Sequence, residues 1–540
     1  MTNRPFKTGV SREQPSLLPP RIEDYVGRDN PCRAIDGYVC ALDLGKLGFR
    51  HAAPGGGSGQ PPYDPADLLK LYLYGYLNQI RSSRRLEREA RRNLELIWLL
   101  KGLAPGYRTI GNFRKDNWAA LKAANRDFVL VVHELGLLGG ALVAIDGAFF
   151  HGDASKASIA TRKRLAEQVA ALDRDIESYG GAIEANDAEE EARSAGDDDR
   201  RNGGGGGVAQ ELAALLAKRA KAQADLDRLA ESGETQLSKT DADARLLTKN
   251  GQTIAGYNVQ IAVDEKHKLI VASEVVNDGN DTGQLHRMAE AAKAALAAET
   301  LTVVADVGYY NGETVKSCEE GGIVPYVPQP DRTGRLAAQG RFSHEDFAYD
   351  AEEDAYRCPA GARLKPMNGF KTDPAGKRHI VYVSRKSTCA TCPLRGRCLT
   401  AKAPKRTIYR WEHEEVVERH RARMKDAGAL MRRRASLAEH PFGTLKCRAG
   451  YRHFLVRGFD KVRGEWSLMA LCYNFARVLS ILGFDGFTDY LARRRLKRAI
   501  LRLLSAATAA IRRVRRFIAR IWAGTSTKSA TIVLRFNPAA

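Results

Sequence analysis

Three things that this 540-residue chain lacks limit what it can be. It has no run of about 18 uncharged apolar residues, which a transmembrane helix needs. Its first residues, MTNRPFKTGVSREQPSLLPP, lack the apolar stretch of a signal peptide. Its nine cysteines are an odd number in a long chain, which argues against a disulfide framework. We therefore expect a cytoplasmic protein that has no membrane partner.

Acidic residues are scarce relative to basic ones. The chain has 85 Lys and Arg against 64 Asp and Glu, a net charge of +21, and residues 493–540 contain no acid at all. Residues 141–330 are nevertheless acidic, at −12, so that the flanking regions carry +33. This balance disfavours a small-metabolite enzyme without a polyanion partner. It favours binding to nucleic acid or to an anionic membrane surface.

Residues 1–140 are predicted to form a helical domain, one of two to four domains expected at roughly 150 residues per domain. Asp64 and Pro65 suit the cap and first position of a helix, and apolar residues follow from Leu68 at helical spacing. Short basic helices joined by tight turns suit helix-turn-helix-like DNA contact, although a bundle with a solvated basic face is the alternative. The candidate DNA-contacting residues are Arg84, Arg85, Arg88, Arg91, Arg92, Arg108, Arg114 and Lys115.

The hydrophobic pattern changes after residue 140. Residues 141–156 and 241–330 contain β-branched apolar runs in the order strand, insert, strand, strand, helix (283–298), strand, helix, strand, which predicts a mixed α/β sheet. Residues 257–264 and 268–276 suit a hairpin. Residues 157–240 interrupt this region with two Leu/Ala-periodic stretches around EEEARSAGDDDRRNGGGGG, which predicts a helical hairpin with a disordered acidic and glycine-rich tip.

Four cysteines gather in residues 331–400: Cys358, Cys389, Cys392 and Cys398. Cys389 and Cys392 form a C-x2-C knuckle, and thiolates at such spacing can close a tetrahedral zinc site that stabilises a small segment. A paired ribbon would show the knuckle twice, so unliganded or redox cysteines are the alternative. The other five are predicted to be buried thiols: Cys32, Cys40, Cys318, Cys447 and Cys472.

Two aspartates stand at the ends of predicted buried strands, Asp146 in AIDGAFF and Asp306 in VADVGYY. Ligand crevices of α/β sheets open at the carboxyl edge of the strands. Two adjacent carboxylates repel unless a divalent cation lies between them, and Mg²⁺ prefers oxygen ligands. The alternative is that each aspartate only caps the helix that follows.

A third carboxylate is expected further along. Glu439 is our choice, because Lys446 follows it after six residues and could reach a phosphate. The competing residues are Glu412, Glu414, Glu415, Glu418 and Glu465, of which the first four lie in a segment that resembles a solvated charged helix.

The ordered segments LVAIDGAFFHGDASK, GYNVQIAVD, VVADVGYYNGE and EHPFGTLKCRAGYRHFLVRGFDKVRGEWSLMALCYNFARVL resemble bacterial insertion-sequence transposases of the Asp-Asp-Glu class. The resemblance points to the IS eleven-eighty-two-like branch, and YDPADLLKLYLYGYLNQIRSSRRLE with TIGNFRKDN resembles the InsH-type N-terminal domain of the same proteins. It covers about residues 20–480.

This resemblance implies an RNase H-like catalytic fold with Asp146, Asp306 and Glu439 as the ligands of Mg²⁺ or Mn²⁺. It implies binding to double-stranded DNA, both terminal inverted repeats and target, by a homodimer or higher oligomer at the nucleoid. Residues 401–490 would carry the glutamate as the helical end of the core. The family's Arg is matched only one position away, by Arg434, and its Tyr is replaced by Met431 or Arg432.

Two other functions fit the same residues: a metal-dependent nuclease that does not join strands, and a DNA-binding protein without catalysis. Residues 491–540 form a basic amphipathic tail, with 11 basic residues and no acid between Arg493 and Arg520. A nonspecific DNA arm, a membrane-surface helix and a weakly constrained extension all suit that tail.

Overall fold

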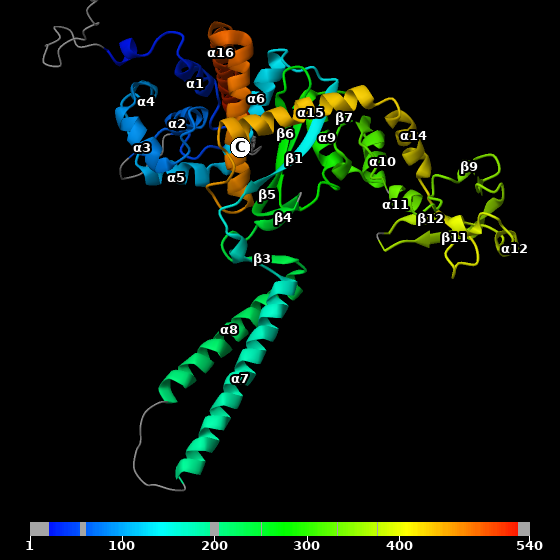
Figure 1. Cartoon of the computed structure of the whole chain (residues 1–540). Coiled ribbons are helices and arrows are strands. Elements are labelled where there is room, and N and C mark those ends of the chain that lie inside the picture. The colour runs from blue at the N-terminus through cyan, green and yellow to red at the C-terminus, as the bar shows by residue number, and fades with distance from the viewer. Residues whose placement is uncertain are drawn as a thin grey trace, which may run out of the picture. The chain divides into compact units, whose positions relative to one another are not determined.

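The computed structural model describes residues 21–53, 61–194, 205–249, 251–331, 333–374 and 376–526 (Figure 1). It divides into two compact units. The helical unit comprises Met1–Arg126 and Ser467–Ala540, and the central unit comprises Asp127–Trp466.

The helical unit contains the short helices that the sequence predicts. They are η1 (Ile22–Tyr25), α1 (Pro31–Cys40), α2 (Pro65–Leu77), α3 (Ser83–Arg92), α4 (Leu94–Leu99) and α5 (Tyr107–Asp116). Asp64 caps α2 as predicted, because its side chain accepts a hydrogen bond from the Ala66 N–H at 2.8 Å, and Pro65 takes the first helical position. Helix α6 (Trp118–Glu134) begins in this unit and ends in the central one.

Helix α16 (Phe459–Ser526) supplies the rest of the helical unit. Its helical geometry breaks at Gly483, whose φ of 71° is a conformation that glycine adopts without strain. The part before this break is buried: the Phe475 ring lies 6.0 Å from Tyr38 of α1, and the Cys472 thiol contacts the Leu73 carbonyl of α2. By length and composition alone, residues 459–501 could cross a membrane, but core helices pass the same test and 56% of the most apolar stretch is buried.

The central unit contains a six-stranded mixed sheet, in agreement with the α/β prediction. Its order is β4-β5-β1-β7-β8, and β6 also pairs with β5. Strands β1, β4, β5 and β6 pair antiparallel, whereas β1, β7 and β8 run parallel. The strands are β1 (Leu142–His151), β4 (Arg245–Lys249), β5 (Gln252–Asp264), β6 (Ile270–Val276), β7 (Leu301–Val304) and β8 (Ile323–Tyr326).

Two helices cover opposite faces of this sheet. Because side chains alternate along a strand, Val143 and Ile145 of β1 pack in one cluster with α9 (Leu285–Leu296), which also includes residues near α10 (Gly312–Glu320). Leu142 and Ala144 pack on the other face against Leu437 of α15 (Gly428–Gly443), which Figure 1 shows lying across β1 and β7. An even-numbered residue of β1 such as Asp146 therefore faces the α15 side.

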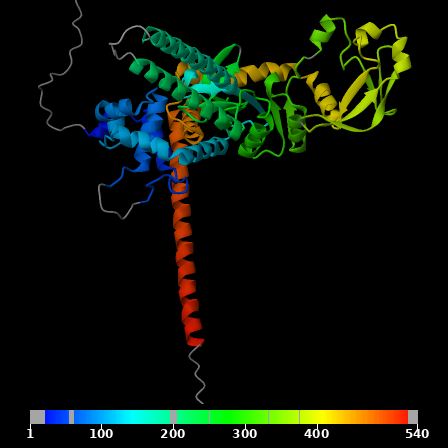
Figure 2. The ribbon, with the colours of Figure 1, turned by 90° about the horizontal axis from the view of Figure 1, so that it is seen from below.

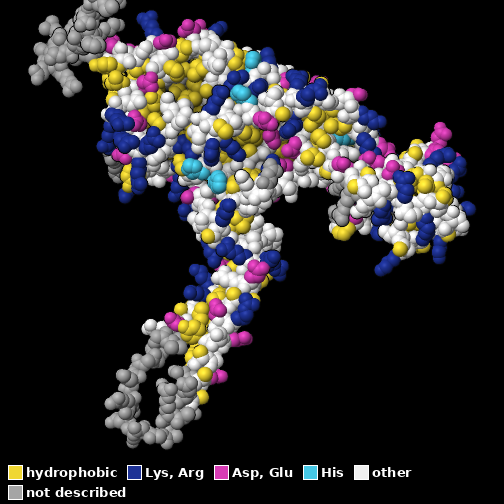
Figure 3. Space-filling view, viewed as in Figure 1, with side chains coloured by type: hydrophobic (Ala, Val, Ile, Leu, Met, Phe, Trp, Pro, Cys, Tyr) yellow, Lys and Arg dark blue, Asp and Glu magenta, His cyan; other side chains and the backbone are white. Residues whose placement is uncertain are grey.

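The insertion is a pair of long helices, α7 (Arg162–Ser194) and α8 (Gly205–Ser232). They pack through Val169, Leu172 and Ala222, and Arg219 pairs with Asp173 at 2.5 Å. Figure 3 shows acidic and basic side chains mixed along their surface. The predicted disordered tip falls largely on residues 195–204, which lie outside the described residues. Beneath the helices, η2 (Lys156–Ser158) leads into a small ladder of β2 (Ile159–Thr161) and β3 (Gln236–Ser238).

A second sheet follows, with the strand order β13-β12-β11-β10-β9. Its strands are β9 (Ala348–Asp350), β10 (Ala355–Arg357), β11 (Arg363–Thr372), β12 (Arg378–Val383) and β13 (Thr407–Trp411), and the short helices near it are α11 (Gly334–Ala338), α12 (Lys386–Ala390) and α13 (Arg395–Cys398). Its last strand, β13, extends the cysteine-rich region past residue 400. Helix α14 (Glu414–Met424) then leads to α15.

Candidate active site

Asp146 and Asp306 lie side by side on the six-stranded sheet. Strands β1 and β7 pair parallel with Ala144 opposite Val304, and each aspartate lies two residues beyond that pair. Asp306 follows its strand, as predicted. The prediction that Asp146 ends its strand is wrong, because the long partner strand β5 pairs with β1 as far as His151.

The carboxyl group of Asp146 is half-buried and carries an electrostatic cost. Burial is the main reason that its pKa is raised, and the charge of Asp306 raises it further. The Gly147 N–H, which donates to Asp146 Oδ1 at 2.8 Å, and the cations Arg434 and Lys249 act in the opposite direction. Two carboxylates in this arrangement are the oxygen-rich environment that a divalent cation stabilises.

The helix-capping alternative applies to only one of the two aspartates. Asp306 Oδ1 accepts the Gly308 N–H at 2.9 Å and so caps the short helix η3 (Val307–Tyr309). Asp146 lies inside a strand and caps no helix. Helix capping therefore does not explain why Asp146, a charged residue, lies within an apolar strand.

Glu439 lies on α15, the helix that crosses the sheet. Its neighbours Leu437 and Ala438 are buried against β1 and β7, whereas Glu439 itself is exposed. Glu439 shares a helical stripe with Phe442, because residues three apart lie on one face of an α-helix. Phe442 lies 6.2 Å from Phe150 of β1, so this stripe faces the strand that carries Asp146.

The structure brings Asp146 and Asp306 together but does not bring Glu439 into contact with them. Among the residues that the structure describes, no group of three or more His, Cys, Asp or Glu side chains is arranged to hold a metal. The site therefore consists of two half-buried carboxylates side by side and an exposed third carboxylate on a neighbouring helix.

Two of the competing glutamates have structural roles. Glu465 is fully buried, and its carboxylate accepts the Leu455 N–H at 2.8 Å. Glu418 pairs with Arg410 at 2.5 Å. The charge pattern had indicated that α14 is a solvated helix. This is wrong for one of its faces, where Val416 and His420 are buried.

Lys446 lies close to Asp146. It belongs to a π-helical turn, η4 (Thr444–Arg448), where its Nζ donates to the Phe149 carbonyl at 2.7 Å and lies 4.4 Å from the centre of the Phe150 ring. Burial lowers the pKa of Lys446 to about 8, Lys249 lowers it too, and the charge of Asp146 opposes them. A lysine in this position can meet a phosphate oxygen that approaches Asp146.

The sequence interpretation missed a buried polar network under the aspartates. Asp281 Oδ1 accepts hydrogen bonds from Asn258 at 2.8 Å and from Gln260 at 2.6 Å, and the Tyr309 hydroxyl donates to Gln260. The charges of Asp146, Asp281 and Asp306 all raise the pKa of Tyr309, which is also buried. The signal was present in YNVQIAVD, where two amides interrupt an otherwise apolar strand.

Gly147 allows this network to lie against β1. A Cβ at this position would come within 2.4 Å of Gln260 Nε2 and 2.8 Å of Asp281 Oδ1. Contacts below about 3 Å are not tolerated in a packed interior. The glycine beside Asp146 is therefore required by packing.

Most of the candidate DNA-contacting residues are exposed in the helical unit. Arg84, Arg85, Arg88, Arg91 and Arg92 of α3 and Lys115 of α5 are exposed, and the dark-blue side chains at the left edge of Figure 3 lie over α3. Glu87 and Glu89 partly neutralise this helix, through pairs with Arg91 at 2.8 Å and with Arg92 at 2.5 Å. The helix thus presents five arginines to solvent with two acidic partners.

The prediction for Arg114 is wrong. Arg114 is only 7% exposed, its guanidinium lies 5.7 Å from the Tyr72 ring centre, and it donates to the Tyr76 hydroxyl at 3.3 Å. Its long side chain packs between the aromatic residues of α2 and α5 instead of reaching the surface. It stabilises the helical unit.

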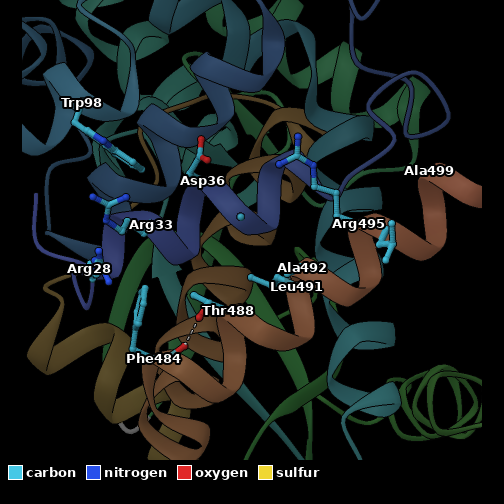
Figure 4. Close-up of a pocket in the computed structure, with 12 residues that line it drawn as sticks. Arg28, Arg33, Asp36, Trp98, Phe484, Thr488, Leu491, Ala492, Arg495 and Ala499 are labelled. Carbon is cyan, nitrogen blue, oxygen red and sulfur yellow. Dashed lines mark hydrogen bonds between the residues drawn. The ribbon is translucent and has the colours of Figure 1, made fainter. Parts of the chain in front are cut away.

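The helical unit also has a cavity of about 600 Å³ between α1 and α16 (Figure 4). Trp98, Phe484 and Leu491 form apolar parts of its wall. Arg33 lies over the Trp98 ring at 4.8 Å and pairs with Glu23, so these groups already satisfy one another.

The four clustered cysteines line one cavity of about 220 Å³ beside the second sheet. The Cys358 thiol accepts the Ala362 N–H at 3.2 Å, and the Cys389 thiol lies 3.0 Å from Ser384 Oγ. The pKa of Cys398 is raised by burial and by the other three thiols, and Arg406 opposes this. The prediction that the other five thiols are buried is wrong for two of them, Cys40 and Cys447, which are exposed.

Comparisons with known proteins agree with this distribution of residues. A family model described as "Transposase DDE domain" matches residues 357–479, which include Glu439, Lys446 and the four clustered cysteines. A second model, "Transposase domain (DUF772)", matches residues 20–116, which include the basic residues of α3 and α5. No curated protein matches the chain.

A search of solved structures found the cryo-EM structure of a piggyBac transposase synaptic complex with hairpin DNA. It is 8% identical, with 87% of this chain and 80% of that chain covered and a TM-score of 0.30, which is too low to carry an argument. The two domain matches are sufficient without it. The chain is a DNA transposase with a DDE catalytic domain.

Proposed function

We propose that this transposase binds the terminal inverted repeats of an insertion element of the IS eleven-eighty-two-like group, cleaves the DNA strand at the element end and joins the released 3′-hydroxyl to target DNA. The observation that carries the proposal is the pair Asp146 and Asp306, which lie on adjacent parallel strands, where burial and, to a smaller extent, the charge of Asp306 raise the pKa of Asp146. Asp306 also caps η3, but helix capping does not account for a carboxylate at Asp146, inside an apolar strand.

The donor set fits a hard divalent cation, because both groups are carboxylates and Asp306 remains partly open to solvent. Asp146 and Asp306 would hold Mg²⁺, and Glu439 would complete the ligands from α15. When bound, such ions supply activation of the attacking oxygen and stabilisation of the leaving one.

The protein's own groups do the positioning. Lys446, fixed by its hydrogen bond to the Phe149 carbonyl, would contact a phosphate oxygen beside Asp146. The hydrogen bonds of Asn258 and Gln260 to Asp281 tie the loop that carries Asp281 to β5, next to the carboxylates. The arginines of α3 would hold the repeat by contacts to its phosphates.

The test is cleavage of a labelled repeat end by Asp146→Asn, with Glu290→Gln as a matched control on the exposed face of α9. We expect the Asn variant to bind the repeat normally in a gel shift but to lose cleavage, and the control to keep both. Retained cleavage would reject the assignment. Cleavage without joining of precut ends would identify a nuclease, and binding by wild-type protein without any Mg²⁺-dependent nicking would identify a non-catalytic DNA-binding protein.

We also propose that the cysteine cavity holds a structural zinc ion. Four thiols line it, and zinc would have to draw them together, because in the structure they are not arranged as a metal site. The N–H to sulfur bond at Cys358 is the kind of contact that stabilises a thiolate. Zinc content measured in Cys389→Ser, with Cys447→Ser as the control outside the cavity, tests this. We expect zinc to be lost only in the first; stoichiometric zinc in both would overturn the site.

A further inference from the structure

The last part of α16 extends beyond the rest of its own unit. Arg498 donates a hydrogen bond to the Ala41 carbonyl, which fixes this point of α16 to the segment that follows α1. Every side chain that the structure describes between residues 499 and 520 is exposed, and Figure 2 shows this stretch running clear of the other helices of the unit. We call residues 499–520 the terminal helix.

The terminal helix exposes a broad apolar face. Its large apolar side chains are 48% to 71% exposed, and apolar patches of this extent on a protein surface mark sites that a partner covers. At about 100° per residue, all of them except Leu501 fall within an arc of roughly 140° that has Ala507 and Val514 near its middle. The apolar face consists of Ile500, Leu503, Leu504, Ile511, Val514, Phe517 and Ile518.

The charges of the terminal helix are all positive and lie outside the apolar face. Arg513 and Arg515 fall near the two edges of that face, and Arg516 falls opposite its middle. The helix contains six basic residues and no acidic one: Arg502, Arg512, Arg513, Arg515, Arg516 and Arg520. A partner that suits this helix is therefore apolar where it meets one side and anionic where it meets the other.

We propose that the terminal helix lies in the surface of an anionic phospholipid membrane. In this arrangement the apolar face enters the boundary between headgroups and acyl chains, and the arginines extend their long side chains to the lipid phosphates. The uniformly positive charge of the helix is complementary to the negative potential of such a surface. The helix lies on the membrane and does not cross it, because six charged residues in 22 are too many for a spanning segment.

Other partners satisfy only one side of the terminal helix. The phosphates of duplex DNA would neutralise the arginines but would leave Leu503, Ile511 and Phe517 in water. A second terminal helix would cover the apolar face but would bring like charges together. We expected no membrane partner because the chain lacks a signal peptide and an uncharged spanning run, and an interfacial helix needs neither.

The experiment is flotation of the full chain, without DNA, with vesicles of phosphatidylglycerol or of phosphatidylcholine in about 0.1 M NaCl. Two exposed alanines form a matched pair: Ala507→Lys places a charge in the apolar face, and Ala509→Lys places the same charge on the basic side. Because both variants have the same net charge, attraction of lipid to the rest of this basic chain is equal in the two.

We expect the wild-type chain and Ala509→Lys to float with phosphatidylglycerol and not with phosphatidylcholine. Ala507→Lys and Ile511→Lys should lower the partition coefficient at least about tenfold, because each buries a charge in the acyl boundary. Arg516→Glu should lower it about tenfold or more, because it replaces attraction to the anionic surface by repulsion. Unchanged circular dichroism would show that the variants keep their helices.

Four results would overturn the proposal. The first is a wild-type chain that floats with neither lipid or equally with both. The second is partitioning that Ala507→Lys and Ile511→Lys leave unchanged. The third is binding to nonspecific duplex DNA that Arg516→Glu weakens and Ala507→Lys strengthens, without any effect on vesicles, which would make the helix a DNA arm. The fourth is a lipid-free dimer that Ala507→Lys dissociates. None of these readouts depends on cleavage, so the result is independent of the catalytic assignment.

Discussion

The two sheets of the central unit are held together in different ways. The six-stranded sheet packs 16 buried residues into one cluster around Val143, Ile145 and Val303, with further apolar contacts to α15 on its other face. The five-stranded sheet has a cluster of only five buried residues, three of them aromatic. Its stability depends on directed contacts, such as the Arg410 guanidinium at 3.7 Å from the Tyr349 ring centre.

This difference in packing predicts that the two sheets respond differently to substitution. The large sheet buries many apolar residues, and their packing offsets the free-energy cost of charged carboxylates such as Asp146. The small sheet buries few apolar residues. Each hydrogen bond or thiol contact there therefore contributes a larger share of its stability. Substitutions in the first should change catalysis, and substitutions in the second should change folding.

The largest expected effect is on catalysis, from Glu439→Gln. Loss of a ligand carboxylate should slow strand cleavage by about 10³-fold, or ~4 kcal/mol of activation free energy. The thermal midpoint should not change, because Glu439 is exposed. Glu465→Gln is the control with the reverse outcome: cleavage activity per folded molecule is kept and the midpoint falls. A cleavage rate for Glu439→Gln within tenfold of wild type would remove Glu439 from the site.

Lys446→Met should have the next largest effect. It keeps the aliphatic volume against Phe150 but removes the charge, and we expect cleavage to fall by about 10²-fold, or ~3 kcal/mol. Single-turnover kinetics measure it. Because the pKa of Lys446 is lowered to about 8, wild-type cleavage should decline above that pH while the variant shows no such decline. An unchanged alkaline limb in the variant would contradict the role.

A third prediction concerns His420, on the helix that follows the small sheet. Burial lowers its pKa to about 4, and both ring nitrogens lack a partner among the described residues. The unfolded chain, with a pKa near 6.5, takes up the proton first, so stability is full above about pH 6.5 and is lost as the pH falls toward 4. Between pH 7.5 and 5.0 the loss should be about 2 kcal/mol, measured by urea unfolding. His420→Leu should remove this pH dependence; an equal dependence in the variant would assign it to other groups.

The smallest effect is expected from Tyr382→Phe in the small sheet. The Tyr382 hydroxyl donates to Asp354 at 2.5 Å, and Tyr349 donates to the same oxygen at 2.8 Å. Removing one donor should cost about 1 kcal/mol, because a bond to a charged group is lost but the carboxylate keeps its other partner. Differential scanning calorimetry would detect it as a small shift, and Tyr409→Phe at the exposed edge is the control. A fall in cleavage rate at unchanged stability would contradict the separation of the two sheets.

Much of the architecture follows from periodicity in the sequence. The cap at Asp64, the hairpin of β5 and β6, helix α9 and the helical insertion were all predictable, because each depends on local pattern. The extent of β1 was not, since the alternation after Asp146 is broken by Gly147 and only pairing with β5 continues the strand. The length of a strand is fixed by its partner, which no local pattern contains.

The candidate site shows the same limit. Asp146 and Asp306 could be found because a carboxylate after an apolar run is unusual. Asp281 could not, because it lies in a loop and gains its role only from amides on a distant strand. Arg114 misled us for the opposite reason: its charge indicates a surface, and only the folded position of Tyr72 shows that it is buried.

Gly147 has a consequence for how the element survives mutation. The position admits no side chain, since Gln260 and Asp281 already occupy the space where a Cβ would lie. Every glycine codon is fixed by its first two bases, so any base change there introduces a side chain or a stop codon. A library of all amino acids at position 147, selected for transposition, should return glycine alone.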